Sequence, residues 1–153
     1  MIPARELEII GEVALAMILG GVIGLDREVA RKPAGLRTHM IVAGASALLV
    51  GLGFSLIENA LISRAVVAVD PVRIIQAIVI GVSFLGAGTI FRDEKYREMQ
   101  GLTTAASLLM STGVGIAVAL RQFSLAVGTV ILVAIVLRFV GKLEDRLHRN
   151  LDD

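Results

Sequence analysis

The sequence contains no cysteine, no tryptophan, three prolines and two histidines among its 153 residues. The lack of cysteine excludes disulfide bonds and thiol nucleophiles, and it also excludes zinc sites built from cysteine and histidine. Charged residues are scarce, at 19%, whereas hydrophobic residues make up 56% and the mean hydropathy is +0.81. This composition excludes an ordinary water-soluble enzyme. The net charge of +1 provides no basic excess, so nucleic acid is not an expected partner.

Five stretches of 18 or 19 residues are almost free of charge and together hold only three of the 29 charged residues. As α-helices they would each reach roughly 27–28 Å, close to the roughly 30 Å hydrocarbon thickness of a bilayer. All three prolines lie outside them, where they do not interrupt a helix. The sequence therefore predicts an all-α integral membrane bundle of five transmembrane helices, forming a single domain. The expected spans are about 7–25, 40–57, 74–91, 102–120 and 123–140, followed by a short charged tail over 141–153.

Lysine and arginine are unequally divided between the two sides of such a bundle. Eleven lie in the loops 26–39 and 92–101 and from Arg138 onward, whereas four lie on the opposite side. By the positive-inside rule, the side richer in basic residues faces the cytoplasm. We therefore predict an external N-terminus and a cytoplasmic C-terminus.

Small residues recur at four-residue spacing along most of the spans, a pattern that lets helices in lipid approach one another closely. This pattern predicts a tight bundle and argues against a wide aqueous channel. The spacing of Gly20 and Gly24 would also suit a homodimer, although packing within one chain explains it equally well. The residues expected in helix packing are Gly20, Gly24, Gly51, Gly81, Gly86, Gly88, Thr103, Ser107, Ser111 and Gly115.

A first candidate polar cluster lies on the predicted outer side. Glu12 falls inside the first span, where a carboxylate is costly unless water, a proton or a partner compensates its charge. Asp70 precedes Pro71 and is expected to cap the third helix, and Arg73 and Gln76 follow it. Magnesium prefers oxygen ligands and commonly binds through one or two carboxylates. Asp70 and Glu12 are therefore a candidate Mg²⁺ site, although capping and headgroup water explain the two residues equally well.

A second candidate cluster lies on the predicted cytoplasmic side, between the first two spans. We expect its arginines mainly to anchor the topology. A salt-bridged cap that fixes the two helices, or a cationic site for lipid headgroups, are the alternatives. His39, which follows the cluster, is predicted to be a surface residue. The cluster comprises Asp26, Arg27, Glu28, Arg37 and Thr38.

The sequence shows no nucleophile with a neighbouring base, no phosphate-binding loop and no acid/base pair, so we predict that the protein is not an enzyme. No cofactor is expected apart from Mg²⁺ as a candidate ligand. Function is therefore expected to depend on the membrane bundle itself.

Four sequence strings, taken together and in order, resemble the membrane domain of the MgtC/SapB family. They are GGVIGLDRE, KPAGLRTHMIVAGASALL, DPVRIIQAIVIGVSFLGAGTI and GLTTAASLLMSTGVGIAVAL. The resemblance implies a multi-pass protein of the bacterial inner membrane. It also implies a short form, without the cytoplasmic domain that longer members carry after the fifth span.

The resemblance further implies a role in adaptation to low magnesium, and in some members regulation of the proton-translocating ATP synthase. We therefore favour a regulatory module that acts through membrane-protein partners. The alternative is a transporter or channel for Mg²⁺ or another small solute that uses the outer carboxylates. A purely structural or lipid-organising role is the third hypothesis.

Overall fold

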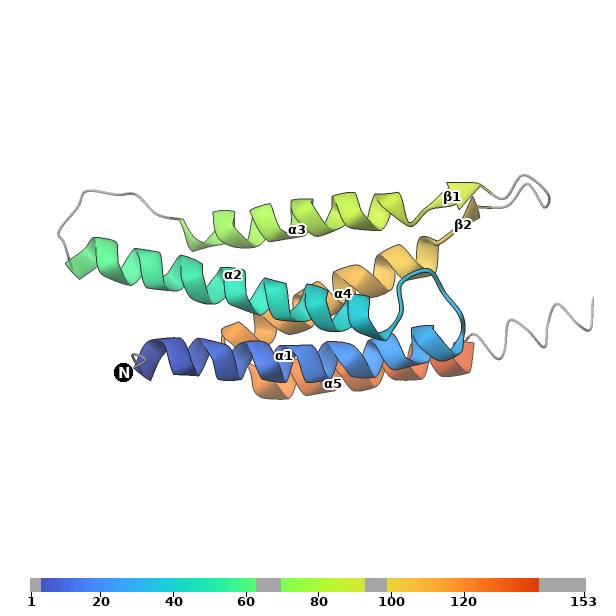
Figure 1. Cartoon of the computed structure of the whole chain (residues 1–153), viewed down its shortest axis with the longest axis horizontal. Helices are drawn as coiled ribbons and strands as arrows, with labels where there is room; N and C mark the ends of the chain where they lie inside the picture. Colours follow the sequence, from blue (N-terminus) through green and yellow to red (C-terminus); the bar gives the residue numbers. More distant parts are fainter. Residues whose placement is uncertain (1–3, 63–69, 93–98, 141–153) are drawn as a thin grey trace, which may run out of the picture.

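The computed structural model describes residues 4–62, 70–92 and 99–140, and it confirms an all-α bundle of five helices (Figure 1). Two very short antiparallel strands join the third and fourth helices, with Phe91 opposite Gln100. The predicted tail over 141–153 lies outside the described residues. The elements are α1 (Ala4–Val29), α2 (Leu36–Ile62), α3 (Pro71–Gly88), β1 (Phe91–Arg92), β2 (Met99–Gln100), α4 (Leu102–Ala119), α5 (Phe123–Ile135) and the π-helical turn η1 (Val136–Val140).

Four helices, α1 to α4, are long and apolar enough to cross a membrane. The apolar helix formed by α5 and η1, Phe123–Phe139, is shorter. Most of the large apolar side chains on the helices point outward, as lipid requires of a membrane bundle; for example, Ile80 is 70% exposed and Phe84 81% exposed. The protein is therefore a multi-pass membrane protein.

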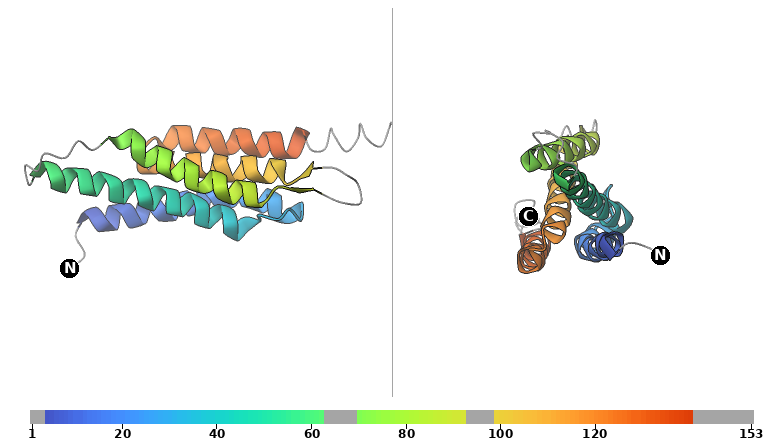
Figure 2. Two further views of the ribbon diagram at one scale, coloured as in Figure 1. Left: turned by 90° about the horizontal axis from the view of Figure 1, so that it is seen from above. Right: turned by 90° about the vertical axis from the view of Figure 1, so that its left-hand side faces the viewer.

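The helices pack in three layers (Figures 1 and 2). The middle layer is formed by α2 and α4, with α1 and α5 on one side and α3 alone on the other. The main core lies among α1, α2, α4 and α5, where Ala16, Ala47 and Val118 are completely buried. In contrast, α3 buries only Ile78 and Gly86.

Close backbone contact joins the central helices. A Cβ atom at Gly20 would lie 2.6 Å from the carbonyl oxygen of His39 and 2.7 Å from Cβ of Ala43. From the other side, a Cβ atom at Gly115 would overlap the carbonyl oxygen of Ala43. Residues larger than glycine would therefore push α1 and α4 away from α2.

The bundle has two distinct ends. The amino end contains the start of α1 and the turn between α4 and α5, around Arg121 (Figure 1). The hairpin end contains the β1–β2 ladder, the connection from α1 to α2, and η1. This arrangement separates the predicted outer and cytoplasmic residues, and the orientation in the membrane stays a prediction.

The helix bounds differ from the predicted spans by a few residues: α1 and α2 extend beyond theirs at both ends, whereas α3 is displaced toward the N-terminus. The third span was expected over 74–91, but α3 begins at Pro71 because Asp70 caps it, and it ends at Gly88. Phe91, expected at the end of that span, lies in β1. Gly101 has a φ of +90° between β2 and α4, where a Cβ would overlap the Thr89 carbonyl oxygen, so this turn requires glycine.

Three of the residues expected in helix packing lie on the surface instead. Gly81 and Gly88 are exposed, and a Cβ at either position would meet no atom within 4 Å. Thr103 also faces outward. For the two glycines the reason is that α3 contacts its neighbours through only a narrow face, with only Ile78 and Gly86 buried. The other expected residues are buried: Gly20, Gly24, Gly51, Gly86, Ser107, Ser111 and Gly115.

Replacing Gly115 tests the backbone contact between α4 and α2. We expect Gly115→Ala to destabilise the protein by about 1–3 kcal/mol, because the added methyl group overlaps the backbone of α2. Gly113→Ala on the same helix is the control, since a Cβ there meets nothing within 4 Å. Circular dichroism melts in detergent should show a lower melting temperature for the first variant only. Equal melting temperatures would contradict the packing described above.

Candidate functional site

At the amino end, Arg121 pairs with both glutamates of α1. Its Nη2 atom lies 2.6 Å from Oε1 of Glu8, and its Nε atom lies 3.3 Å from Oε1 of Glu12. Arg5 adds a second cation, with Nη1 3.0 Å from Oε2 of Glu8. The side chain of Glu12 is only 9% exposed, whereas those of Glu8 and Arg121 are about half exposed. The carboxylate of Glu12 is therefore buried beside a paired cation.

The turn between α4 and α5 positions Arg121. This residue has a φ of +59°, which is uncommon for a residue other than glycine. Its backbone N–H donates to Val118, and the N–H of Gln122 donates to Ala117, so the turn closes α4 tightly. The left-handed residue thus reverses the chain within a few residues and points the guanidinium toward α1.

The pairing at the amino end fixes the charge of Arg121. The hydrogen bond from Arg121 to Glu8 and the charge of that carboxylate raise the pKa of the guanidinium above its ordinary value. The guanidinium borders a cavity of about 310 Å³, also lined by Glu12, Leu15 and Phe123. The cavity therefore has a carboxylate on one wall, already compensated by a permanent cation.

The other residues of the predicted outer cluster lie elsewhere at this end. Asp70 Oδ1 accepts the backbone N–H of Val72 at 2.9 Å, so Asp70 is the cap of α3 that the sequence predicts. Its Oδ2 atom lies 3.9 Å from Nε of Arg73, and Gln76 is exposed. Asp70 and Glu12 line different cavities. No group of three or more His, Asp or Glu side chains that could hold a metal is found among the described residues.

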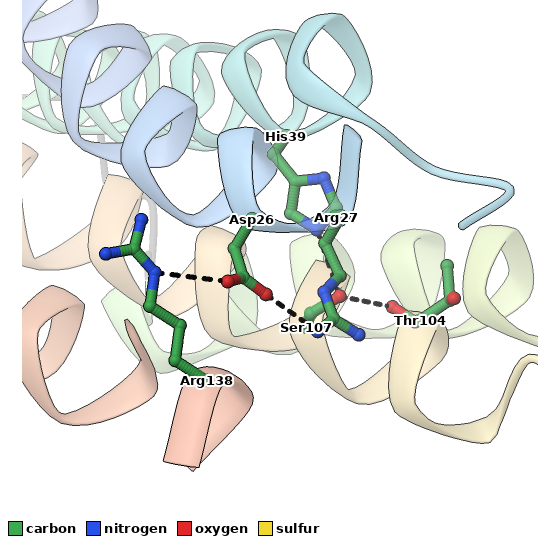
Figure 3. Close-up of polar contacts among 6 residues, drawn as sticks. All are labelled: Asp26, Arg27, His39, Thr104, Ser107 and Arg138. Atoms are coloured by element: carbon green, nitrogen blue, oxygen red, sulfur yellow. Dashed lines mark hydrogen bonds and ion pairs between the residues drawn. The ribbon is translucent and has the colours of Figure 1, made fainter. Parts of the chain in front are cut away.

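At the hairpin end, Asp26 is bound by two arginines (Figure 3). Nη2 of Arg27 lies 2.8 Å from Oδ2 of Asp26, and Nε of Arg138 lies 3.3 Å from Oδ1. The side chains of Asp26 and Arg27 are only 13% and 6% exposed. Arg138 belongs to η1, so this interaction joins the end of α1 to the end of the α5 helix.

The remaining members of the predicted cytoplasmic cluster do not join this pair. The Oε2 atom of Glu28 accepts the backbone N–H of Leu36 at 3.0 Å, so Glu28 caps the start of α2. A Cβ at Gly35 would overlap that carboxylate, so a larger residue there would displace the cap. Arg37 and Thr38 are exposed.

His39 is completely buried, which makes the prediction of a surface histidine wrong. Its Nδ1 atom lies 2.8 Å from the carbonyl oxygen of Gly35, and its Nε2 atom lies 3.0 Å from Oγ of Ser107 (Figure 3). A carbonyl oxygen only accepts, so Nδ1 donates its proton to Gly35. In the neutral ring, Nε2 then accepts the hydroxyl proton of Ser107. That hydroxyl also lies 2.8 Å from the carbonyl oxygen of Thr104. The hydroxyl proton of Ser107 is therefore shared between Nε2 of His39 and this carbonyl oxygen.

Sequence reasoning missed two residues that organise these sites, Arg121 and His39. Arg121 is the single basic residue between the fourth and fifth spans, on the side where Glu12 was expected. That position was the only indication in the sequence that these two residues pair. His39 precedes Ala43 and Ala47 at four-residue spacing. It therefore continues the small-residue face of α2, and that spacing was a usable signal of burial.

Removing the cation at the amino end tests whether Glu12 depends on it. We expect Arg121→Gln to lower the melting temperature by a few degrees, because it leaves a buried carboxylate without its charged partner. The double variant Glu12→Gln/Arg121→Gln should recover most of the loss, since it removes both charges. Arg73→Gln is the matched control, because its contact with Asp70 is long and exposed. If Arg121→Gln melts like this control, the pairing is unimportant for stability.

Removing the hydroxyl of Ser107 tests the histidine contact between α2 and α4. We expect Ser107→Ala to cost about 1–3 kcal/mol in unfolding free energy, because a buried ring nitrogen loses its partner. Thr103→Ala, on the exposed face of the same helix, should change stability by less than about 0.5 kcal/mol. Thermal melts of the two variants in the same detergent provide the comparison. Similar melting temperatures would show that the contact contributes nothing.

Comparison with known proteins identifies several bacterial relatives of the chain. An uncharacterized protein of Haemophilus influenzae is 34% identical over 95% of this chain and 60% of its own length. The "Putative magnesium transporter YhiD" of Escherichia coli K12 is 34% identical over 92% of this chain and 64% of its own length. "Protein MgtC" of Salmonella typhimurium is 37% identical over 77% of this chain and 46% of its own length.

The chain thus spans less than two thirds of the length of these relatives. No solved structure matches it. A model of the MgtC family matches residues 13–146, a range that extends into all five helices. It includes Arg121 and the pair of Asp26 with Arg138, whereas Glu8 and Glu12 precede it. The resemblance expected from the four sequence strings is therefore confirmed, and the chain belongs to the MgtC family.

Proposed function

We propose that the protein is a non-enzymatic module of the bacterial inner membrane, linked to magnesium homeostasis, that acts through contacts with other membrane proteins. The observation that carries this proposal is the closed packing at the middle of the bundle. Five apolar side chains are completely buried there: Ala16, Ala43, Ala47, Val114 and Val118. The name of the relative from Escherichia coli supports the link to magnesium.

The closed core argues against ion transport through this bundle. Magnesium gives up its hydration water reluctantly, so a path for it needs room and oxygen ligands. Between the amino and hairpin ends, the core shared by α1, α2, α4 and α5 is mainly apolar, and the polar side chains buried in α2 and α4 are hydroxyls and one imidazole, with no carboxylate among them. At Gly115 the backbones of α4 and α2 are in direct contact. A hydrated ion would have to separate these helices.

The buried serine–histidine pair does not suggest an enzyme. Ser107 and His39 have the hydrogen bond expected of a nucleophile and its base, but their exposures are only 3% and 0%. The same hydroxyl is also within hydrogen-bonding distance of Thr104 in its own helix. A structural role in joining α2 to α4 therefore accounts for the pair, because a substrate cannot reach Ser107.

A transporter of Mg²⁺ or another small solute is the second candidate. The observation that favours it is the cavity at the amino end, where Glu12 and Arg121 line about 310 Å³. In that mechanism, an arriving cation would compete with Arg121 for the carboxylate. The name of the relative from Escherichia coli also supports this alternative.

Magnesium entry into sealed liposomes that contain the purified protein separates the two candidates. We expect entry, followed with an internal dye, to equal that of protein-free liposomes, because the core is closed. Circular dichroism of the same liposomes verifies that the protein is folded and inserted. Entry above the protein-free level that falls in Glu12→Gln, but not in the exposed-residue variant Thr103→Ala, would overturn the proposal and support transport. Asp70→Asn tests the other carboxylate in the same assay.

A further inference from the structure

An apolar groove runs between α2 and α3. Of these two helices, α3 is the one that packs loosely on the bundle, since it buries only Ile78 and Gly86. The volume of the groove is about 890 Å³. Ile41, Ala45 and Leu49 line it on α2, and Ala77 and Gly81 line it on α3. The small residues of α3 leave this space open, since a Cβ at Gly81 would meet no atom within 4 Å.

The groove carries two opposite charges at one end. Asp70 and Arg73 both line it and stand at the start of α3. Their side chains are 53% and 83% exposed, and the 3.9 Å between Nε of Arg73 and Oδ2 of Asp70 leaves both groups able to bind other ions. Among the described residues, Asp70 is the only charged partner of Arg73. The groove thus ends in an exposed carboxylate and an exposed guanidinium side by side.

The position of these charges matches the level of lipid headgroups. A Cβ at Gly53 would lie 2.5 Å from Cδ1 of Ile74, so the start of α3 lies beside the last part of the second predicted span. From Arg73 to Leu85, the groove follows α3 for twelve residues, or roughly 18 Å. One leaflet accounts for half of the roughly 30 Å hydrocarbon thickness of a bilayer, or roughly 15 Å. The apolar part of the groove is therefore about as long as one leaflet is deep.

We propose that this groove binds a zwitterionic phospholipid, with one acyl chain between α2 and α3. Arg73 binds the phosphate of the headgroup and Asp70 binds its ammonium group. An anionic lipid fits less well, because Asp70 would repel a second negative charge without an ammonium group to balance it. The groove is separate from the cavity beside Glu12 and Arg121, and the proposal does not rest on the proposed function.

Native mass spectrometry of the purified full chain tests this proposal. The protein is mixed in detergent with equal amounts of phosphatidylethanolamine and phosphatidylglycerol, and the lipids that stay bound are counted. We expect one phosphatidylethanolamine molecule to be retained in preference to phosphatidylglycerol. Asp70→Asn and Arg73→Gln should each weaken its retention by about tenfold, equivalent to about 1.4 kcal/mol.

Two glycine variants test the groove itself. Gly81→Leu places a large side chain in the groove and should reduce retention of the lipid. Gly128→Leu on α5 is the control, since a Cβ there also meets no atom within 4 Å but lies outside the groove. The proposal is wrong if the two lipids are retained equally, or if Gly81→Leu and Gly128→Leu bind them alike. A dimer without bound lipid would instead assign the groove to a second copy of the chain.

Discussion

Lipid offers helices no hydrophobic drive to associate, so this bundle depends on how closely its backbones approach one another. Ala43 of α2 is the point where that approach is closest. Gly20 of α1 faces its Cβ atom, and Gly115 of α4 faces its carbonyl oxygen. Three helices therefore meet at one small residue, and any enlargement at these positions would separate α1 or α4 from α2.

The close approach explains where the polar groups lie. Since the middle of the bundle has no space for hydrated side chains, buried charge is found toward its two ends, and each charge has a partner there. Glu12 pairs with Arg121 at the amino end, and Asp26 pairs with Arg138 at the hairpin end. Both interactions connect α1 with the α4–α5 unit, so α1 is bound electrostatically near each of its ends.

Hydropathy predicts the existence and approximate bounds of all five helices, because lipid excludes charge from their middle. The four-residue spacing of small residues also indicates the buried faces of α1, α2 and α4. The same pattern misleads on α3, where Gly81 and Gly88 face outward. Spacing shows which helix face permits close contact, but it does not show whether a neighbour lies opposite.

Partners distant in the sequence were beyond prediction for a related reason. Asp26 and Arg138 are 112 residues apart, and Glu12 and Arg121 come from opposite parts of the chain. In each pair, the sequence around one residue does not indicate which distant residue is its partner. Each pair forms only because the order and direction of the helices bring the end of η1 to the end of α1, and the turn after α4 to its beginning.

The interactions at the two ends do not specify the structure equally. Moving α1 by one helical turn, roughly 5.4 Å, would leave one glutamate opposite Arg121 where there are now two, so the amino end keeps an ion pair in either register. The same movement at the hairpin end would replace Asp26 with Val22 or Ala30. Neither can accept a hydrogen bond from the side chain of Arg138 through its own side chain. The glycines of α1 oppose this movement as well, because it would bring Ala16 to the place of Gly20, or Glu28 to the place of Gly24, where a Cβ has no room. The pairing of Asp26 with Arg138 and the glycine contacts with α2 therefore specify the same register of α1.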